Sequence, residues 1–414
     1  MKFKMTALEK KWVLYDVGNS AFTMLVATIF PIYFNHLADI AGISSVNYLA
    51  YWGYATSICT LFVAVLGPTL GAVADTKNYK KVIFSVFLGV GVIGCIVLGF
   101  LSSWIWFLGV FVLTKTGYSS SLIFYDAMLT DVTESERMDV VSSQGFAWGY
   151  IGSCIPFVAS LGVVLGGGKL GIGMQTSMVI AFLITSVWWL LSAVPLLRSY
   201  KQKYFVETTQ HVVRNSFRRL GSTFKEIARE KHVLFFLLAF FFYIDGVYTV
   251  IDMATAYGQA LGLDSTGLLL ALLLTQIVAF PCVLIFSRLS KKLASTTIIT
   301  ICIAAYFCIA LYAYGLDTQL DFWILAVLVG MFQGTIQALS RSYFAKIIPA
   351  EKSGEYFGIY DICGKGASIF GTAFVSVLSQ ITGNVNIGVS ALSVFFLVGF
   401  ILFRKAVKAA KAVK

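Results

Sequence analysis

The chain has 414 residues, of which 58% are hydrophobic and only 12% are charged. Soluble chains carry about 25% charged residues, so this composition excludes an ordinary soluble enzyme. It also excludes a disordered chain, and the 35 Phe, 20 Tyr and 8 Trp exceed what one aqueous domain could bury. The composition therefore predicts a polytopic membrane protein.

Apolar runs of membrane-spanning length follow one another along the chain. Because about 20 apolar residues cross a bilayer as a helix, they predict twelve spans arranged as six plus six. We expect an all-α integral membrane protein with a six-helix bundle over 1–197, a linker over 198–232 and a second six-helix bundle over 233–414. The runs cover residues 12–35, 48–72, 82–101, 103–130, 140–166, 175–197, 233–257, 265–287, 295–315, 321–345, 355–380 and 383–403.

The formal net charge of +11 is distributed unevenly. Of the 31 Lys and Arg residues, 28 lie on one side of the predicted spans and Lys169 lies alone on the other. Cytoplasmic connections carry such an excess of basic residues. Both termini are therefore predicted to be cytoplasmic in a multi-pass protein of the cell membrane, and the charge gives no support to nucleic-acid binding. The polar, basic residues 1–11 and the long run after them predict a first helix that is retained rather than cleaved as a signal.

The linker contains an amphipathic pattern. Its apolar residues are spaced by 4, 3, 4 and 3 and alternate with basic residues, which predicts a helix lying on the membrane surface. This helix could simply join the two halves, or it could bind a partner or regulate the protein. The apolar residues are Val213, Phe217, Leu220, Phe224 and Ile227.

The two halves repeat each other at an offset of about 215 residues. Residues 125–150 and 340–365 each combine a helix end, a charged turn and the glycine-bearing start of the next helix. Parallel repeats of this kind are one arrangement of secondary transporters, in which the binding site lies near mid-membrane between the repeats. The repeat predicts two pseudo-symmetric six-helix bundles.

Several motifs resemble a known family. The stretch GAVADTKNYKK (71–81) is similar to the loop between helices two and three of the major facilitator superfamily, with Gly71, Ala74, Asp75 and Lys80 at matching positions. The stretches YDVGNSAF (15–22), FYIDGVYTVI (242–251) and the run over 330–371 resemble the vacuole-effluxer-like branch of that superfamily. The resemblance implies a transporter that exports amino acids, with helices one, four, seven and ten lining a central cavity.

Ionisable side chains within predicted spans cost about 2.5 to 3.5 kcal/mol each on insertion scales, so they mark cavities or pairs. Lys115 and Asp245 are predicted to lie deepest, and Gln333 reaches a similar depth in helix ten. With the implied cavity helices, they give a substrate-binding set of Asp16, Asn19, Lys115, Asp245, Tyr248, Gln333 and Gln337.

The remaining charges favour other roles. Asp361 and Lys365 are four residues apart in the favourable order for an intrahelical ion pair, and Asp252 is close to a span end, where a carboxylate is tolerated. Asp126 and Arg341 occupy equivalent positions of the repeat and could pair as an inner gate. Asp75 is predicted to brace neighbouring helices as part of the same gating set.

The first hypothesis for function is a secondary active transporter that works by alternating access. Lys115 could hold an anionic group and Asp245 a cationic group, which suits a zwitterion such as an amino acid. Asp245 or Asp16 could couple transport to protons, while sodium coupling or uncoupled transport would use the same architecture. The expected partners are a small-molecule substrate, protons and the lipid bilayer, with the protein a monomer.

Two other classes compete with a transporter. An integral-membrane lipid-modifying enzyme would need a nucleophile, an acid–base pair or a metal cluster, and no Cys/His metal spacing occurs. We therefore expect no enzymatic activity and no cofactor or metal. A receptor or scaffold without transport activity could use the linker helix.

Overall fold

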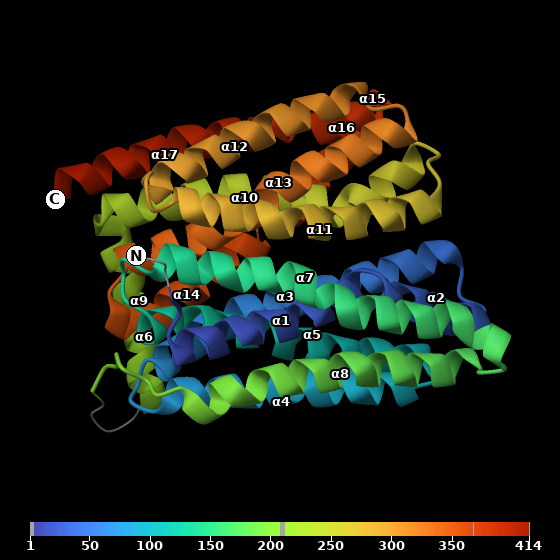
Figure 1. The fold of residues 1–414 in the computed structure, drawn as a ribbon, viewed down its shortest axis with the longest axis horizontal. Coiled ribbons are helices and arrows are strands. Elements are labelled where there is room, and N and C mark those ends of the chain that lie inside the picture. Colours follow the sequence, from blue (N-terminus) through green and yellow to red (C-terminus); the bar gives the residue numbers. More distant parts are fainter. Residues whose placement is uncertain (1–3, 208–211, 367, 414) are drawn as a thin grey trace. The chain divides into compact units, whose positions relative to one another are not determined.

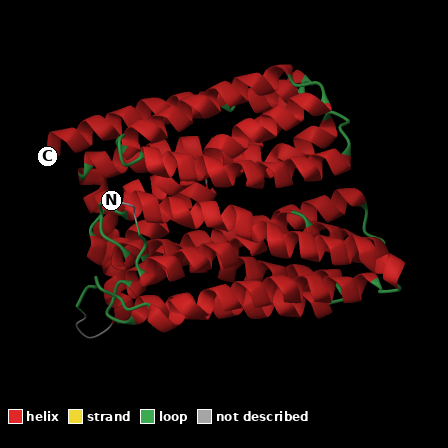
Figure 2. Cartoon of the chain, viewed as in Figure 1, coloured by secondary structure: helices red, strands yellow, loops and turns green. Residues whose placement is uncertain are grey.

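The computed structural model describes residues 4–207, 212–366 and 368–413, and nearly all of them are helical (Figure 2). Within these ranges twelve stretches are long and apolar enough to cross a membrane, which confirms the predicted number. Their bounds are Ala7–Ile40, Tyr51–Ala74, Tyr79–Phe100, Trp104–Val132, Met138–Lys169, Met174–Ser199, Lys231–Ala254, Gly267–Leu289, Ser295–Gly315, Gln319–Ile347, Ala350–Thr382 and Val385–Ala412.

Contacts divide the chain into two compact units. The first unit comprises Met1–Val132, Trp148–Val213 and Glu351–Gly358, and the second comprises Thr133–Ala147, Arg214–Ala350 and Ile359–Lys414. The two units change over within the predicted linker 198–232, after Val213. In addition, residues 133–147 of the first sequence half belong to the second unit, and residues 351–358 of the second half belong to the first unit. Each of these segments contains the start of a helix whose remainder belongs to the other unit.

The first unit is built around its aromatic interior. Helix α1 packs against α8, and α4 packs against both α5 and α8 (Figure 1). Trp12 of α1 stacks on Tyr125 of α5 with ring centroids 4.4 Å apart, and the Trp12 indole N–H donates to the Tyr125 carbonyl at 3.1 Å. The helices are α1 (Ala7–Ala27), α2 (Ile29–Ile40), α3 (Ser45–Ala74), α4 (Tyr79–Phe100), α5 (Trp104–Ala127), α6 (Leu129–Val132), α7 (Met138–Gly166, from Trp148 onward) and α8 (Met174–Ser199).

The first span is interrupted between α1 and α2. The chain leaves helical geometry at Thr28, with φ −131° and ψ −66°. Pro31 follows three residues later, and because proline has no N–H, it cannot bond the carbonyl four residues before it. The Thr28 hydroxyl donates instead to the carbonyl of Met24 at 2.6 Å. The break is therefore a local consequence of the sequence.

The second unit repeats this plan. Helix α10 packs against α17, α11 packs against α13, and α12 packs against both α13 and α17. Phe236 of α10 stacks on Phe344 of α13, with ring centroids 5.6 Å apart. The helices are α9 (Val212–Arg229), α10 (Lys231–Ala260), α11 (Ser265–Leu289), α12 (Ser295–Tyr312), α13 (Gln319–Ile347), α15 (Ser368–Thr382), α16 (Val385–Ser390) and α17 (Ser393–Val413).

The eleventh span is also interrupted. It begins as α14 (Ser353–Asp361), passes through a π-helical turn (Ile362–Gly366) and continues as α15. The Lys365 ammonium pairs with the Asp361 carboxylate at 2.5 Å, as the spacing of four residues predicts. Turns of π-helix are frequently found at functional sites.

The linker begins as an extended strap on the first unit. Val206 pairs with Thr76 in an isolated parallel bridge, and its N–H donates to the carbonyl of Asp75 at 2.8 Å. The predicted amphipathic helix forms as α9, in which Ile227 is buried and Phe224 is 49% exposed. The side chains of Val213, Phe217 and Leu220 lie outside the described part of the chain.

Candidate functional site

In the first unit, Lys115 lies on α5 among buried hydroxyl side chains. Lys115 is partly exposed, and its ammonium lies 5.8 Å from the centre of the Phe111 ring, within reach of a cation–π interaction. Hydroxyl side chains surround it along the same helix, and all of them are buried. They are Thr114, Thr116, Ser119, Ser120 and Ser121. These hydroxyls point in several directions, because Thr114 lies against Gly94 of α4 while Ser121 bonds to Tyr15 of α1.

Asp16 and Asn19 form a buried pair on α1. The Asn19 amide donates to the Asp16 carboxylate at 3.2 Å and to the carbonyl of Tyr15 at 3.2 Å. Close packing brings α7 to the same place, because a side chain at Gly149 would meet the hydroxyl of Ser20 and the carbonyl of Asp16. The structure thus brings these two predicted residues together and fixes the orientation of the carboxylate.

In the second unit, the Asp245 carboxyl is fully buried on α10. Its Oδ1 accepts from the Gly371 backbone N–H at 3.1 Å and from the Thr249 hydroxyl at 3.2 Å. Gly371 is the fourth residue of α15. Asp245 therefore joins α10 to α15, a structural role that its sequence context did not predict. Among the described residues, its Oδ2 has no hydrogen-bond partner.

The other predicted binding residues of this unit lie on α10 and α13. Gln333 is buried, and its amide nitrogen has no hydrogen-bond partner among the described residues. Tyr248 and Gln337 are partly exposed. The predicted binding set is thus divided, with Asp16, Asn19 and Lys115 in the first unit and four residues in the second.

The segment 351–358 is held in the first unit by a cluster that we call the first latch: Asp75, Lys80, Asp131, Ser353 and the N–H groups of Gly354 and Glu355. The fully buried Asp75 carboxylate accepts from the Gly354 N–H at 2.7 Å and from the Glu355 N–H at 2.9 Å. These amides open α14, so a carboxylate satisfies the free donors of its first turn. Burial raises the pKa of Asp75 to about 7, against the opposing effects of Lys80 and the two amides.

Lys80 connects the first latch to the linker. Its buried ammonium contacts Asp131 at 3.1 Å, Ser353 at 2.8 Å and Asp75 at 3.9 Å. Asp131 in turn accepts from the N–H groups of residues 203 and 204 and from the Tyr200 hydroxyl. A buried charge is stable only when its partners are satisfied, so this network fixes the strap as well as α14.

Glycines allow α14 to approach α3 closely in the first unit. A side chain at Gly71 would collide with the carbonyl of Gly354, and one at Gly358 would lie 2.6 Å from the backbone of Gly67. Gly67 and Gly71 are four residues apart on α3, and Gly354 and Gly358 are four residues apart on α14. The glycine faces of the two helices therefore meet backbone to backbone.

The segment 133–147 is held in the second unit by a cluster that we call the second latch: Asp139, Ser142, Ser295, Arg341, Ser342 and Lys346. The Asp139 carboxylate accepts from Ser342 at 2.6 Å and pairs with Lys346 at 2.5 Å. The Arg341 guanidinium donates to the Ser142 hydroxyl at 2.9 Å and lies 4.4 Å from the centre of the Phe146 ring. The start of α7 is thus fixed by charge-assisted bonds.

The predicted gate residues are distributed over both units. Asp75 braces neighbouring helices, as expected, through its bonds to α14. Arg341 lies in the second unit and contacts the start of α7 there, whereas Asp126 lies in the first unit and is partly exposed. Direct pairing of Asp126 with Arg341 stays a prediction.

Sequence reasoning missed most of the latch residues. Lys80 is a match in the loop motif in the sequence analysis, which gives no role to Asp131 or Asp139. The repeat offers one signal, because Asp139 and Gly354 are equivalent at its offset and both lie in the first turns of a helix. Ser353 followed two residues later by Glu355 is the second signal, since such residues commonly open helices.

Comparison with known proteins identifies the family. The family described as vacuole effluxer Atg22 like matches residues 8–132 and 129–414. The chain belongs to this family. It is 42% identical over 407 residues to an uncharacterized MFS-type transporter, YxiO, of Bacillus subtilis, covering 97% of this chain and 95% of that protein. Autophagy-related protein 22 of Cryptococcus neoformans is 26% identical over 248 residues, which cover 55% of this chain and 43% of the fungal protein.

Solved structures establish the fold of this family member. The major facilitator transporter FucP, in an outward conformation, superposes with a TM-score of 0.73 at 15% identity, covering 97% of each chain. At this identity the likeness concerns the fold alone. The protein is therefore a membrane transporter of the major facilitator type, and the enzyme alternative is not retained because the relatives are transporters.

Proposed function

We propose that this transporter moves an amino acid or similar zwitterion across the cell membrane by proton-coupled alternating access. The observation that carries the mechanism is the reciprocal exchange of helix starts. Each unit holds, through a buried carboxylate, the first turns of a helix that continues in the other unit. Rocking of the two bundles would require each cycle either to release these helix starts or to bend α7 and α14 where the chain passes between the units.

Two charges support the choice of substrate. Lys115 on α5 and Asp245 on α10 bring one cation and one anion to helices that the family resemblance assigns to the cavity. A zwitterion presents the complementary pair, and charge-assisted hydrogen bonds are the strongest polar contacts available for it. The buried Gln333 amide adds a donor from α13.

Asp245 is the proposed coupling residue. Its Oδ1 holds α15, while Oδ2, which accepts no bond from the described residues, is available to carry a proton. Asp16 is the second candidate, with Asn19 as its hydrogen-bond donor. The lysine and arginine distribution supports a cytoplasmic location of both termini, which would make the latches an inner gate.

Proteoliposomes loaded with a pH-sensitive dye and challenged with a panel of amino acids test this function. We expect substrate-dependent proton movement and counterflow of labelled substrate. Asp245→Asn keeps the Oδ1 acceptor for Gly371 but removes both the titrating group and the negative charge, so proton movement should be lost and counterflow should fall. Asp252→Asn, an exposed carboxylate on the same helix, is the control.

The outcomes separate the parts of the proposal. Counterflow of no amino acid would refute the substrate class and leave room for a receptor or scaffold. Proton movement that persists in Asp245→Asn at the wild-type rate would refute its coupling role. A loss of counterflow in Lys115→Gln, but not in Asp252→Asn, would support the zwitterion site.

A further inference from the structure

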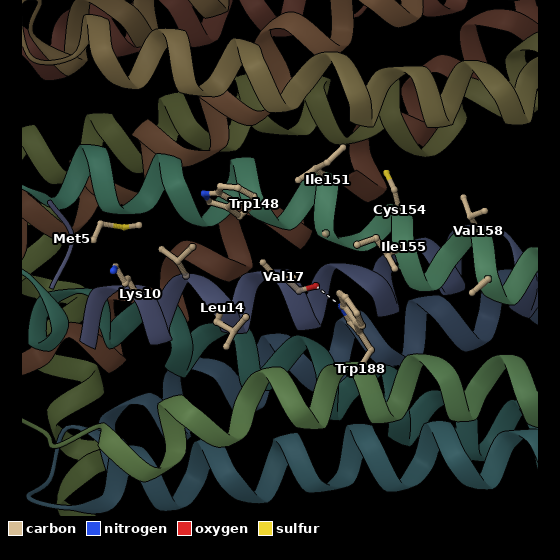
Figure 3. A pocket seen from close by; sticks show the side chains of 13 residues that line it. Met5, Lys10, Leu14, Val17, Trp148, Ile151, Cys154, Ile155, Val158 and Trp188 are labelled. Carbon is tan, nitrogen blue, oxygen red and sulfur yellow. Dashed lines mark hydrogen bonds between the residues drawn. The ribbon is translucent and has the colours of Figure 1, made fainter. Parts of the chain in front are cut away.

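A groove runs along the first unit between α1, α7 and α8, with a volume of about 930 Å³ (Figure 3). Its lining is almost entirely apolar. Leu14, Trp148 and Ile155 are 37%, 44% and 62% exposed, so the surrounding medium reaches them. The lining residues are Met5, Lys10, Val13, Leu14, Val17, Trp148, Ile151, Gly152, Cys154, Ile155, Val158, Ala159 and Trp188.

Glycine and tryptophan shape the floor and one wall of the groove. A side chain at Gly152 would collide with Val17, so α7 approaches α1 closely and the larger residues on either side stand above the floor. The Trp188 indole N–H donates to the Val17 carbonyl at 3.2 Å, which fixes this wall (Figure 3). The groove is therefore preformed by packing within one unit.

The length of the groove matches one leaflet of a bilayer. From Trp148 to Ala159 it follows α7 for eleven residues, or about 16 Å at 1.5 Å per residue. The hydrocarbon core is about 30 Å thick, so half of it is nearly the same length. Lys10 lies beyond this stretch on α1, so an acyl chain that starts at Lys10 would fill the larger part of the groove.

The charge lies at one end only. Lys10 and Met5 are at the end where α1 begins, whereas Val158 is at the opposite end (Figure 3). The lysine and arginine distribution predicts that the Lys10 end is cytoplasmic. Lys10 is exposed, and a lysine at this level extends its ammonium to the headgroup region. The cytoplasmic leaflet carries the anionic lipids that such an ammonium attracts.

We propose that this groove is a binding site for one anionic phospholipid, with its acyl chain along α7 and its phosphate at Lys10. The site lies where α7 passes from the second unit to the first, because Trp148 is the first residue of α7 in the first unit. A lipid bound there contacts the helix just beyond the second latch. The lining contains none of the proposed substrate or coupling residues.

Native mass spectrometry of the full chain in detergent, titrated with phosphatidylglycerol or phosphatidylcholine of identical acyl chains, tests the proposal. We expect one phosphatidylglycerol to bind about fivefold more tightly than phosphatidylcholine, the effect of about one lysine near an anionic headgroup. Lys10→Ala should remove this preference and Lys10→Arg should keep it. Lys292→Ala, which neutralises an exposed lysine of the second unit, should leave it unchanged.

A second pair of variants locates the acyl chain. Ile155→Trp fills the groove and should lower the occupancy of both lipids, whereas Ile301→Trp, at an exposed isoleucine of α12, should lower neither. Equal binding of the two lipids to the wild type would overturn the proposal, as would equal losses in Lys10→Ala and Lys292→Ala. A dimer that Ile155→Trp dissociates would assign the groove to a second copy of the chain instead.

Discussion

Removal of the Asp75 carboxyl is expected to release the start of α14. In Asp75→Ala the N–H groups of Gly354 and Glu355, now bonded at 2.7 and 2.9 Å, lose their acceptor in a buried place. Each unsatisfied buried donor costs about 1–3 kcal/mol, so the latched state should lose at least about 2 kcal/mol, a factor of about thirty. Hydrogen–deuterium exchange of the peptide covering 351–358 should accelerate by that factor.

Two variants control this measurement. Asp321 accepts from the Thr318 N–H at the exposed start of α13, so Asp321→Ala removes the same kind of cap elsewhere and should leave the 351–358 peptide protected. Asp75→Asn retains an acceptor oxygen and should keep most of the protection. Unchanged exchange in Asp75→Ala would refute the reasoning, and so would equal acceleration in Asp75→Ala and Asp321→Ala, which would indicate general loosening of the protein.

Three further predictions concern the latches and their packing. Burial raises the pKa of Asp75 from 3.8 to about 7, so between these pH values closing of the first latch takes up a proton. This contribution to the stability of the latch should be complete below about pH 4 and lost as pH rises through about 7. Hydrogen–deuterium exchange of the 351–358 peptide, corrected for the intrinsic exchange rate, should lose this pH dependence in Asp75→Asn. Asp139→Ala removes the acceptor for two serines and Lys346, so exchange at the start of α7 should rise about tenfold, while exchange at α14 stays unchanged if the latches are separate. Gly358→Leu places a side chain against the backbone of α3 and should lower the free energy of unfolding by about 1–3 kcal/mol, measured by thermal unfolding. Gly162→Leu, where the space is open, should leave the stability unchanged. Equal losses in the two variants would argue against the glycine contact.

The sequence predicted the spans well because their signal is local. A membrane helix satisfies its own backbone groups and must be apolar over one continuous run, so each span is encoded in about 20 adjacent residues. The ion pair of Asp361 and Lys365 was predictable for the same reason, since both partners lie on one helical turn. Pro31 favours the interruption at Thr28, but Pro68, Pro156 and Pro281 lie inside unbroken helices, so proline by itself does not determine a break.

The latches depend on partners that are far apart in the chain. Lys80 belongs to a basic loop, and nothing nearby indicates that it is fully buried; its partners Asp131 and Ser353 are 51 and 273 residues away. The acceptor role of Asp75 involves backbone N–H groups, which every residue except proline has. Such bonds leave no pattern of side-chain types to detect.

Asp245 shows the same limit within the candidate site. The apolar run over 233–257 shows that Asp245 lies deep in a predicted span, and a charge at that depth predicted a functional carboxylate. Its bond to Gly371, 126 residues away, exists only because α15 packs beside α10 in the folded chain. One carboxyl oxygen therefore holds a helix, while the other is left for a proton or substrate in the proposed function.

The order of apolar and charged residues alone determined that this chain spans a membrane twelve times and repeats itself, because lipid imposes that requirement on each segment separately. Tertiary structure decided which carboxylates hold helix starts and which segments the two units exchange. Those choices follow from the free N–H groups at helix starts and from glycine faces that let two backbones meet, and both require the folded chain to bring distant residues together.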